Sequence, residues 1–238
     1  MKTLIKTVAL GLICGMATVA RAEDIAALTK QLKDKDPDIR RTAAQQLSEM
    51  GSDAKPAMTA LMSALKDDKD MFVRRFAAKA IGGIGTDAKS AVPALTNAMH
   101  DGLKDGKTEL SEAAVEALGH MGPTAVAPLV EALKTKSTDK PEGGKKKEVV
   151  ETKEGAIRKL AAQAIGSLGK DAKTAVPTLT DLLKDKEART EAAQALGNIG
   201  PDAKSALDAL KEIEDNKKEK DKAFKKAVGS AIKKIEAK

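Results

Sequence analysis

The sequence is dominated by one frame that recurs five times and restricts what the chain can fold into. Each copy contains an apolar stripe, a glycine and a second apolar stripe, always in that order. In residues 70–102, Val73, Ala77 and Ile81 have the spacing of one helical face ahead of Gly85. Such a unit cannot cover its own apolar side, so the copies must stack. The five turn glycines are Gly51, Gly85, Gly122, Gly169 and Gly200.

The ends of the helices within a unit can also be predicted. Asp70 is placed to cap the first helix of its unit, and Gly85 suits the residue after that helix, where a left-handed backbone favours glycine. Ser90 is predicted to cap the second helix, and Thr108 the first helix of the third unit. Each unit is therefore expected to be a helical hairpin.

Three short motifs carry a resemblance to a known family. A D-x-x-x-R motif begins at Asp36 and again at Asp70, and an A-V-P-x-L run begins at Ala91 and at Ala175. G-x-D-A-K turns start at Gly51, Gly85, Gly169 and Gly200. The pattern resembles the HEAT family, particularly the short repeats named after phycobilisome lyases. The resemblance implies an all-α, right-handed α-solenoid whose second helices line a concave surface, and it implies no single activity.

Residues 1–22 differ from everything that follows. Lys2 and Lys6 precede a short apolar run, and Ala20-Arg21-Ala22 is an A-x-A site. This is the pattern of a secretory signal peptide cleaved before Glu23, and an amphipathic first helix is the alternative. Export to the periplasm or the medium is therefore expected.

Residues 23–238 are predicted to form one solenoid of about twelve helices. Lone helices at 24–35 and 218–236 are expected to cap the array, which terminal repeats need in order to face water. A flexible insertion is predicted at 135–153, either a tolerated loop or a recognition element. The two-helix repeats are expected at 36–69, 70–102, 108–134, 154–186 and 187–215.

Composition argues against most kinds of chemistry. The only cysteine, Cys14, lies in the predicted leader, and the two histidines, His100 and His120, occupy non-equivalent repeat positions. No catalytic residue, metal site or cofactor is therefore expected, and the protein is not expected to be an enzyme. The chain has no Trp or Tyr and a net charge of +7, with the excess of lysine near its C-terminal end.

Two columns of basic residues follow the repeat. The first is predicted to form a structural ladder between repeats, with a ligand-binding row as the alternative; Ser111 interrupts it. The second lies four residues after the turn glycines and either docks an acidic partner or anionic polymer, or is a solvated repeat consensus. The first column is Arg40, Arg74, Arg158 and Arg189. The second is Lys55, Lys89, Lys173 and Lys204.

The second helices supply the remaining candidate binding residues. They are polar and mixed in charge, and they include no aromatic anchor of the kind that centres tight interfaces. They are Lys66, Thr96, Asn97, His100, Thr180, Asp181 and Lys184.

The favoured function is an exported, non-catalytic scaffold that binds a partner protein, acidic or extended, through the concave or turn-edge surface. A phycobilisome-lyase-like chromophore lyase subunit is one alternative. Nucleic-acid or anion binding through the lysine column is another, disfavoured because stacking aromatics are few. No membrane span is expected after the leader, and the sequence does not define an oligomeric state.

Overall fold

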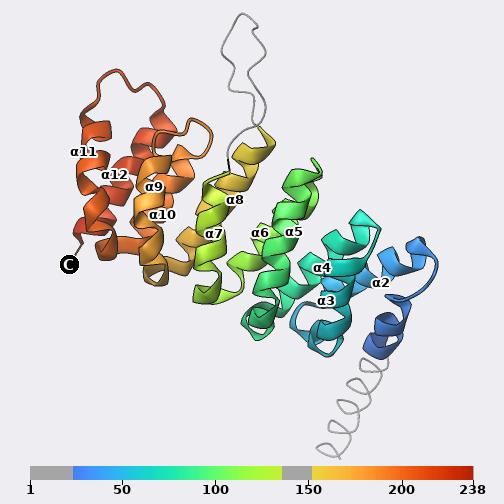
Figure 1. Ribbon diagram of the computed structural model, residues 1–238. Coiled ribbons are helices and arrows are strands. Elements are labelled where there is room, and N and C mark those ends of the chain that lie inside the picture. The colour runs from blue at the N-terminus through green and yellow to red at the C-terminus, as the bar shows by residue number, and fades with distance from the viewer. Residues whose placement is uncertain (1–23, 136–151, 238) are drawn as a thin grey trace, which may run out of the picture.

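The computed structural model describes residues 24–135 and 152–237. Over this part of the chain the regular structure is helical and no strand occurs. The helices follow one another in file and do not surround a common centre (Figure 1). The predicted all-α solenoid is thereby confirmed. The predicted leader, and the predicted insertion apart from its edges, lie outside the described residues.

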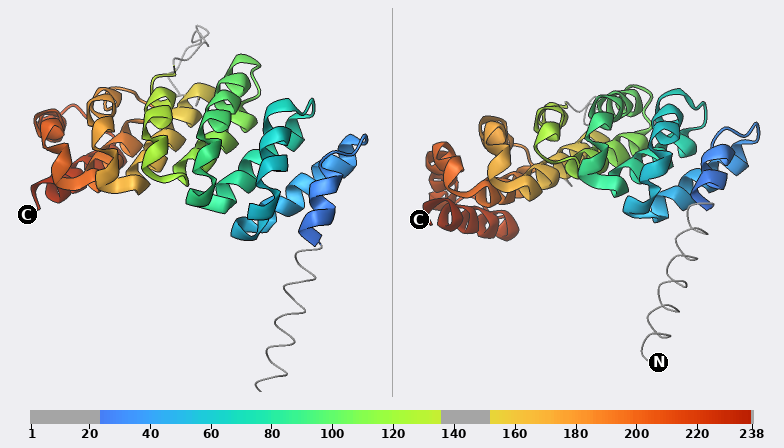
Figure 2. Two further views of the ribbon diagram at one scale, coloured as in Figure 1. Left: turned by 60° about the horizontal axis from the view of Figure 1, so that its bottom comes forward. Right: turned by 90° about the horizontal axis from the view of Figure 1, so that it is seen from below.

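The helices form two layers, seen from two further sides in Figure 2. A helical segment at 24–31 precedes both layers. The first-helix layer contains α2 (Pro37–Glu49), α4 (Met71–Ile84), α6 (Thr108–Gly119), α8 (Lys153–Leu168), α10 (Arg189–Ile199) and α12 (Lys222–Glu236). The second-helix layer contains α3 (Met58–Asp67), α5 (Val92–Lys104), α7 (Val126–Leu133), α9 (Val176–Leu182) and α11 (Leu207–Asp215).

The turn inside each hairpin has the same construction in all five units. It begins with a glycine in the left-handed region, for example Gly85 with a φ of 73°. A 3₁₀ segment follows and runs directly into the second helix, as Gly85–Ala91 does into α5. The alanines of this segment, such as Ala88 and Ala91, are fully buried. The predicted role of the turn glycines is confirmed.

Helix capping agrees with the sequence in one place and differs in others. The Asp70 carboxylate accepts hydrogen bonds from the backbone N–H groups of Phe72 and Val73, as predicted. The Ser90 prediction was wrong, because the 3₁₀ turn continues into α5 and leaves no side-chain cap. Thr108 lies inside α6, which has no side-chain cap either. Instead, Thr152 caps α8 from within the predicted insertion, so that α8 begins at Lys153.

The first-helix layer is packed more tightly than the sequence indicated. In four successive pairs, a glycine near the end of one first helix faces an alanine of the next, and an added Cβ would lie 2.9–3.2 Å from its nearest atom. No side chain separates these backbones, so the helices approach closely. The pairs are Gly82 with Ala117, Gly119 with Ala164, Gly166 with Ala195, and Gly197 with Ala231.

The core runs the length of the array between the two layers. Leu47, Ile81, Leu118 and Ile165 of the first helices are fully buried. One leucine of each second helix is fully buried as well: Leu61, Leu95, Leu129, Leu179 and Leu210. Among the described residues the large apolar side chains that stay exposed are Ile39 and Phe72. In the same part of the chain no helix is long and apolar enough to cross a bilayer.

Candidate partner-binding surface

The arginine ladder consists of Arg40, Arg74, Arg158 and Arg189, each in the first turns of a first helix. Each guanidinium binds a carboxylate in the last turn of the following second helix, as Arg74 does with Asp101, or in the loop after that helix, and three of them also bind a carbonyl near the end of the preceding one. One side chain therefore connects the ends of two successive second helices. The geometry supports the structural interpretation of this column.

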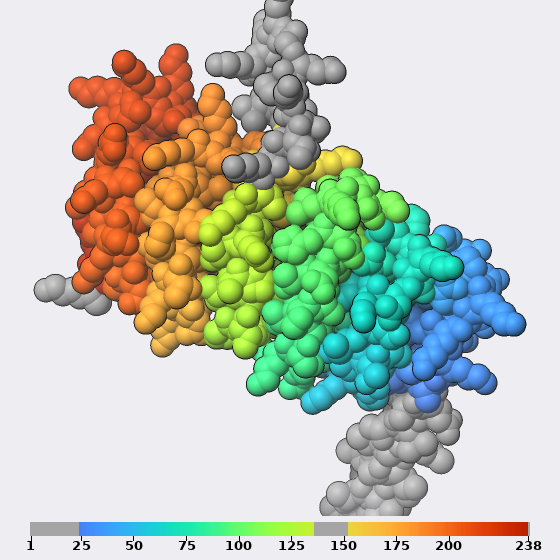
Figure 3. Space-filling view, viewed as in Figure 1, coloured from blue at the N-terminus to red at the C-terminus, as the bar shows by residue number. Residues whose placement is uncertain are grey.

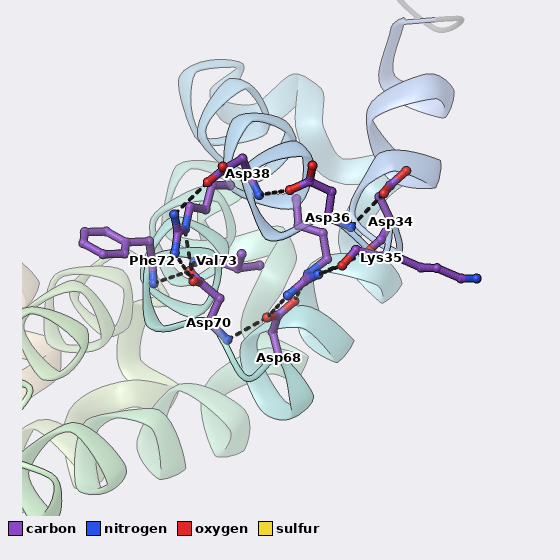
Figure 4. A network of polar contacts seen from close by, with 10 residues as sticks. Asp34, Lys35, Asp36, Asp38, Asp68, Asp70, Phe72 and Val73 are labelled. Carbon is purple, nitrogen blue, oxygen red and sulfur yellow. Dashed lines mark hydrogen bonds and ion pairs between the residues drawn. The ribbon is translucent and has the colours of Figure 1, made fainter.

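Arg40 shows the pattern most completely, and its partners Asp34 and Asp68 are labelled in Figure 4. Its Nε and Nη2 atoms donate to the two oxygens of Asp68 at 2.7 and 3.0 Å, and its Nη1 atom donates to the Asp34 carbonyl at 3.0 Å. The neighbouring Arg41 pairs with Asp70 and lies over the Phe72 ring. The hydrogen bond from Arg41 is the largest cause that lowers the pKa of Asp70.

Arg158 is the most buried member, with 6% of its surface exposed. Its Nη1 donates to the Thr135 carbonyl at 2.8 Å, while Asp185 and Glu187 lie 2.9 and 2.7 Å from other guanidinium nitrogens. Glu187 also accepts from the Thr152 hydroxyl. A Cβ on Gly155 would lie 2.5 Å from this carboxylate, so a larger residue there would displace Glu187 from its present contacts.

Arg189 holds two carboxylates and also covers the Phe224 ring, 4.4 Å from its centroid. Glu219 and Asp221 lie 2.7 and 3.1 Å from its nitrogens. The pKa of Glu219 is lowered by the Asp221 backbone N–H and then by Arg189. The pKa of Asp221 is lowered chiefly by the Phe224 backbone N–H, with Arg189 adding to the effect.

The third unit replaces the arginine by Ser111, which is fully buried. Its hydroxyl donates to the Met99 carbonyl at 2.7 Å. A Cβ on Gly102 would lie 2.4 Å from the Ser111 oxygen, so α5 and α6 meet where an arginine would not fit. In the third unit, close packing of α5 against α6 therefore replaces the ion pair that the arginine makes in the other units.

Two grooves open between neighbouring second helices, on the face seen in Figure 3. The α3–α5 groove has a volume of about 540 Å³, and the α7–α9 groove about 690 Å³. A ladder arginine lines each of them: Arg74 with Asp101 in the first, Arg158 with Asp185 in the second. The ladder thus forms part of both groove walls, which the sequence analysis did not anticipate.

The structure brings together some of the predicted binding residues. Lys66, Asn97 and His100 line the α3–α5 groove, and Asp181 lines the α7–α9 groove. The hydroxyls of Thr96 and Thr180 are directed to their own helices, donating to the Val92 and Val176 carbonyls. Lys184 is exposed but does not line either groove.

The sequence analysis missed several apolar groove residues. Pro93 and Ala94 line the α3–α5 groove beside Met62, which was expected on this face, and Leu133 and Leu182 line the α7–α9 groove. Pro93 belongs to the recurring A-V-P-x-L run, so this motif could have indicated the groove wall.

The lysine column is exposed at the turn edge and lies apart from both grooves. It is interleaved with aspartates from the same G-x-D-A-K turns, and Lys55 pairs with Asp87 of the next repeat at 2.9 Å. Thr124 occupies the aspartate position of the third turn, next to Lys89 in repeat order. The column is therefore a row of mixed charge, which weakens its hypothetical role in binding an anionic polymer.

The repeat construction agrees with comparisons of the sequence with known families. The pattern of HEAT repeats matches residues 6–70, 25–105, 58–141 and 147–228, so the chain belongs to the HEAT-repeat family. The first match starts inside the segment predicted as a leader. No curated protein sequence matches the chain.

One solved structure shares the fold, and a second aligns over much of the chain. A chain from the complex of CpcE and CpcF of phycocyanin lyase from Nostoc sp. PCC7120 aligns with a TM-score of 0.53 and 21% identity, covering 89% of this chain and 94% of that one. A chain from a study of the cadherin–β-catenin interaction aligns with a TM-score of 0.49 and 14% identity, over 88% of this chain and 44% of that one.

Proposed function

We propose that the protein is an exported, non-catalytic scaffold that binds an extended, acidic segment of a partner protein on its second-helix face. One observation carries the proposal: the α3–α5 groove gathers Lys66, Asn97 and His100 beside Arg74. HEAT repeats are typical protein-interaction modules, and the two grooves lie on the same face of the array.

The charges of the two grooves support an acidic segment. Lys66 and Arg74 line the α3–α5 groove together with one carboxylate, Asp101, so this groove is positive. In the α7–α9 groove Lys134 and Arg158 are balanced by two aspartates. We therefore place a partner carboxylate in the α3–α5 groove.

The groove also supplies what an extended peptide needs besides charge. Asn97 offers an amide that can both donate and accept hydrogen bonds to a peptide backbone. Met62, Pro93 and Ala94 provide apolar surface for a neighbouring side chain. This combination of a few polar groups on an apolar wall is typical of ligand grooves.

The carboxyl groups with shifted pKa values do not have the shift that a general acid needs. Asp70, Glu219 and Asp221 all have lowered pKa values, and all three bind arginines. A general acid that works near neutral pH needs a raised pKa instead.

The test compares two tryptophan variants in binding to a partner captured from envelope extract and then purified. Asn97→Trp fills the α3–α5 groove, whereas Gln163→Trp adds the same bulk on the exposed side of α8. We expect Asn97→Trp to weaken binding at least about tenfold, measured by calorimetry, and Gln163→Trp to leave it unchanged. Equal affinities of the two variants for the partner would contradict binding in the α3–α5 groove.

A second candidate is a chromophore lyase subunit, supported by the shared fold with a phycocyanin lyase chain. Incubation with a bilin and an acceptor protein distinguishes it. A coloured covalent adduct that forms only when this chain is added would favour the lyase over the scaffold.

A further inference from the structure

The positive charge of the chain is concentrated at one end of the solenoid. Residues 216–238 contain nine lysines and three carboxylates, and so carry six of the seven net positive charges. The remaining 215 residues are nearly neutral. This separation makes the last helix, α12, and the loop before it different from every other part of the surface.

The fold removes the carboxylates of this segment from the lysines beside them. Glu219 and Asp221 alternate with lysines in the sequence, but both turn inward to Arg189 of α10. The third carboxylate, Glu236, pairs with Lys211 of α11 at 2.8 Å. The lysines are therefore not neutralised by their neighbours in sequence.

Three of these lysines lie on one exposed stripe of α12. Lys222, Lys226 and Lys233 are exposed, and their spacing places them opposite the buried face formed by residues such as Phe224 and Ala231. The stripe extends over about 16 Å of helix. Gly229 and Ser230 lie between Lys226 and Lys233, and the Glu214 carboxylate of α11 lies close to Gly229, so one carboxylate borders the stripe there.

Lysines at the borders of the stripe extend the positive surface. Lys234 donates to the Asn198 amide oxygen at 2.8 Å and Lys225 to the Asn216 carbonyl, and neither contact neutralises the charge. Lys217, Lys218 and Lys220 are exposed in the loop that precedes α12.

We propose that this lysine stripe docks the solenoid on the surface of an anionic lipid bilayer. The stripe carries compact point charges, which suit a diffuse plane of lipid phosphates better than bidentate recognition. Phe224 of α12 is buried beneath Arg189, so the stripe offers no ring on which a nucleic-acid base could stack. This inference is independent of the groove on the second-helix face.

The experiment measures co-sedimentation of the protein isolated from the envelope fraction with vesicles of phosphatidylcholine and phosphatidylglycerol, and with pure phosphatidylcholine vesicles. The test variant changes Lys222, Lys226 and Lys233 to Gln. The control variant changes Lys55, Lys89 and Lys173 to Gln, an equal loss of charge on the turn edge. Circular dichroism checks that both variants fold.

We expect the parent chain to bind only the anionic vesicles and to be released by salt. The α12 variant should lose about a hundredfold in partitioning, at about fivefold per lysine, and the control variant only a few-fold. Equal losses in the two variants would overturn the proposal, because net charge alone would then explain binding. Tighter binding of double-stranded DNA than of vesicles at the same lysines would also overturn it.

Discussion

Gly82 of α4 lies against Ala117 of α6 so closely that a Cβ atom on Gly82 would be 2.9 Å from the Ala117 Cα atom. The same relationship recurs at three further junctions of the first-helix layer. Backbones in that layer are in direct contact, whereas the second helices are separated by grooves between α3 and α5 and between α7 and α9. This difference between the layers determines which face is available for binding.

The close contact predicts that Gly82→Ala destabilises the solenoid. The added methyl overlaps the backbone of α6, which should cost about 1–3 kcal/mol and outweigh the better helix propensity of alanine. Gly229→Ala is the matched control, because its Cβ meets only the flexible Glu214 carboxylate, at 3.1 Å. Urea denaturation should show a lower midpoint for Gly82→Ala alone; equal midpoints would contradict tight packing.

The arginine ladder should contribute far more to stability than the lysine column. Arg158→Ala leaves Asp185 and Glu187 without their guanidinium partner, at a cost of about 3 kcal/mol. Lys55→Ala removes a pair in which both side chains are 61% exposed, and should cost less than about 1 kcal/mol. Free energies of unfolding from denaturant titrations measure both. If Lys55→Ala lowered the free energy of unfolding as much as Arg158→Ala, the arginine ladder would have no special role in stability.

Stability should decrease in acid. Asp70, Glu219 and Asp221 have lower pKa values folded than unfolded, so the unfolded chain takes up more protons as the pH falls. The stabilisation is present at neutral pH and is lost as the pH drops through about 4 and below. Arg189→Gln removes one cause of the lowered pKa of Glu219 and Asp221, so its unfolding free energy should depend less steeply on pH. A slope equal to that of the parent chain would rule out this coupling.

The repeat could be predicted from the sequence because the signals that define it are local. The turn glycines need a positive φ, and the Asp70 cap depends only on the next three residues. The Gly82–Ala117 contact depends on how two repeats are juxtaposed, and the pattern within one helix does not reveal that. Ser90 was assigned as a cap because the continuous 3₁₀ turn cannot be read from residue types.

The candidate site was predicted only in part, for a similar reason. Lys66, Asn97 and His100 could be assigned to one face from helical periodicity. Arg74 is both a ladder member and a groove residue, because its side chain reaches Asp101 at the wall of the groove. This position depends on how the repeats stack, which the pattern within one helix does not reveal.

Export gives a prediction about the covalent chain. If residues 1–22 are a cleaved leader, intact-mass spectrometry of the protein from the envelope fraction should show a chain that begins at Glu23. Replacing Ala20 and Ala22 with bulky residues should retain the longer form. A chain that begins at Met1 and is found with the cytosolic fraction would contradict export.

Site-specific photo-crosslinking tests the central claim, that partners bind the second-helix face, most directly. A benzophenone amino acid is placed at Asn97 in the α3–α5 groove, and in a second variant at Gln163 on the exposed side of α8. Irradiation with the purified partner should give a crosslinked product from position 97, competed away by unlabelled protein, and none from position 163. A product from position 163 alone would contradict the account.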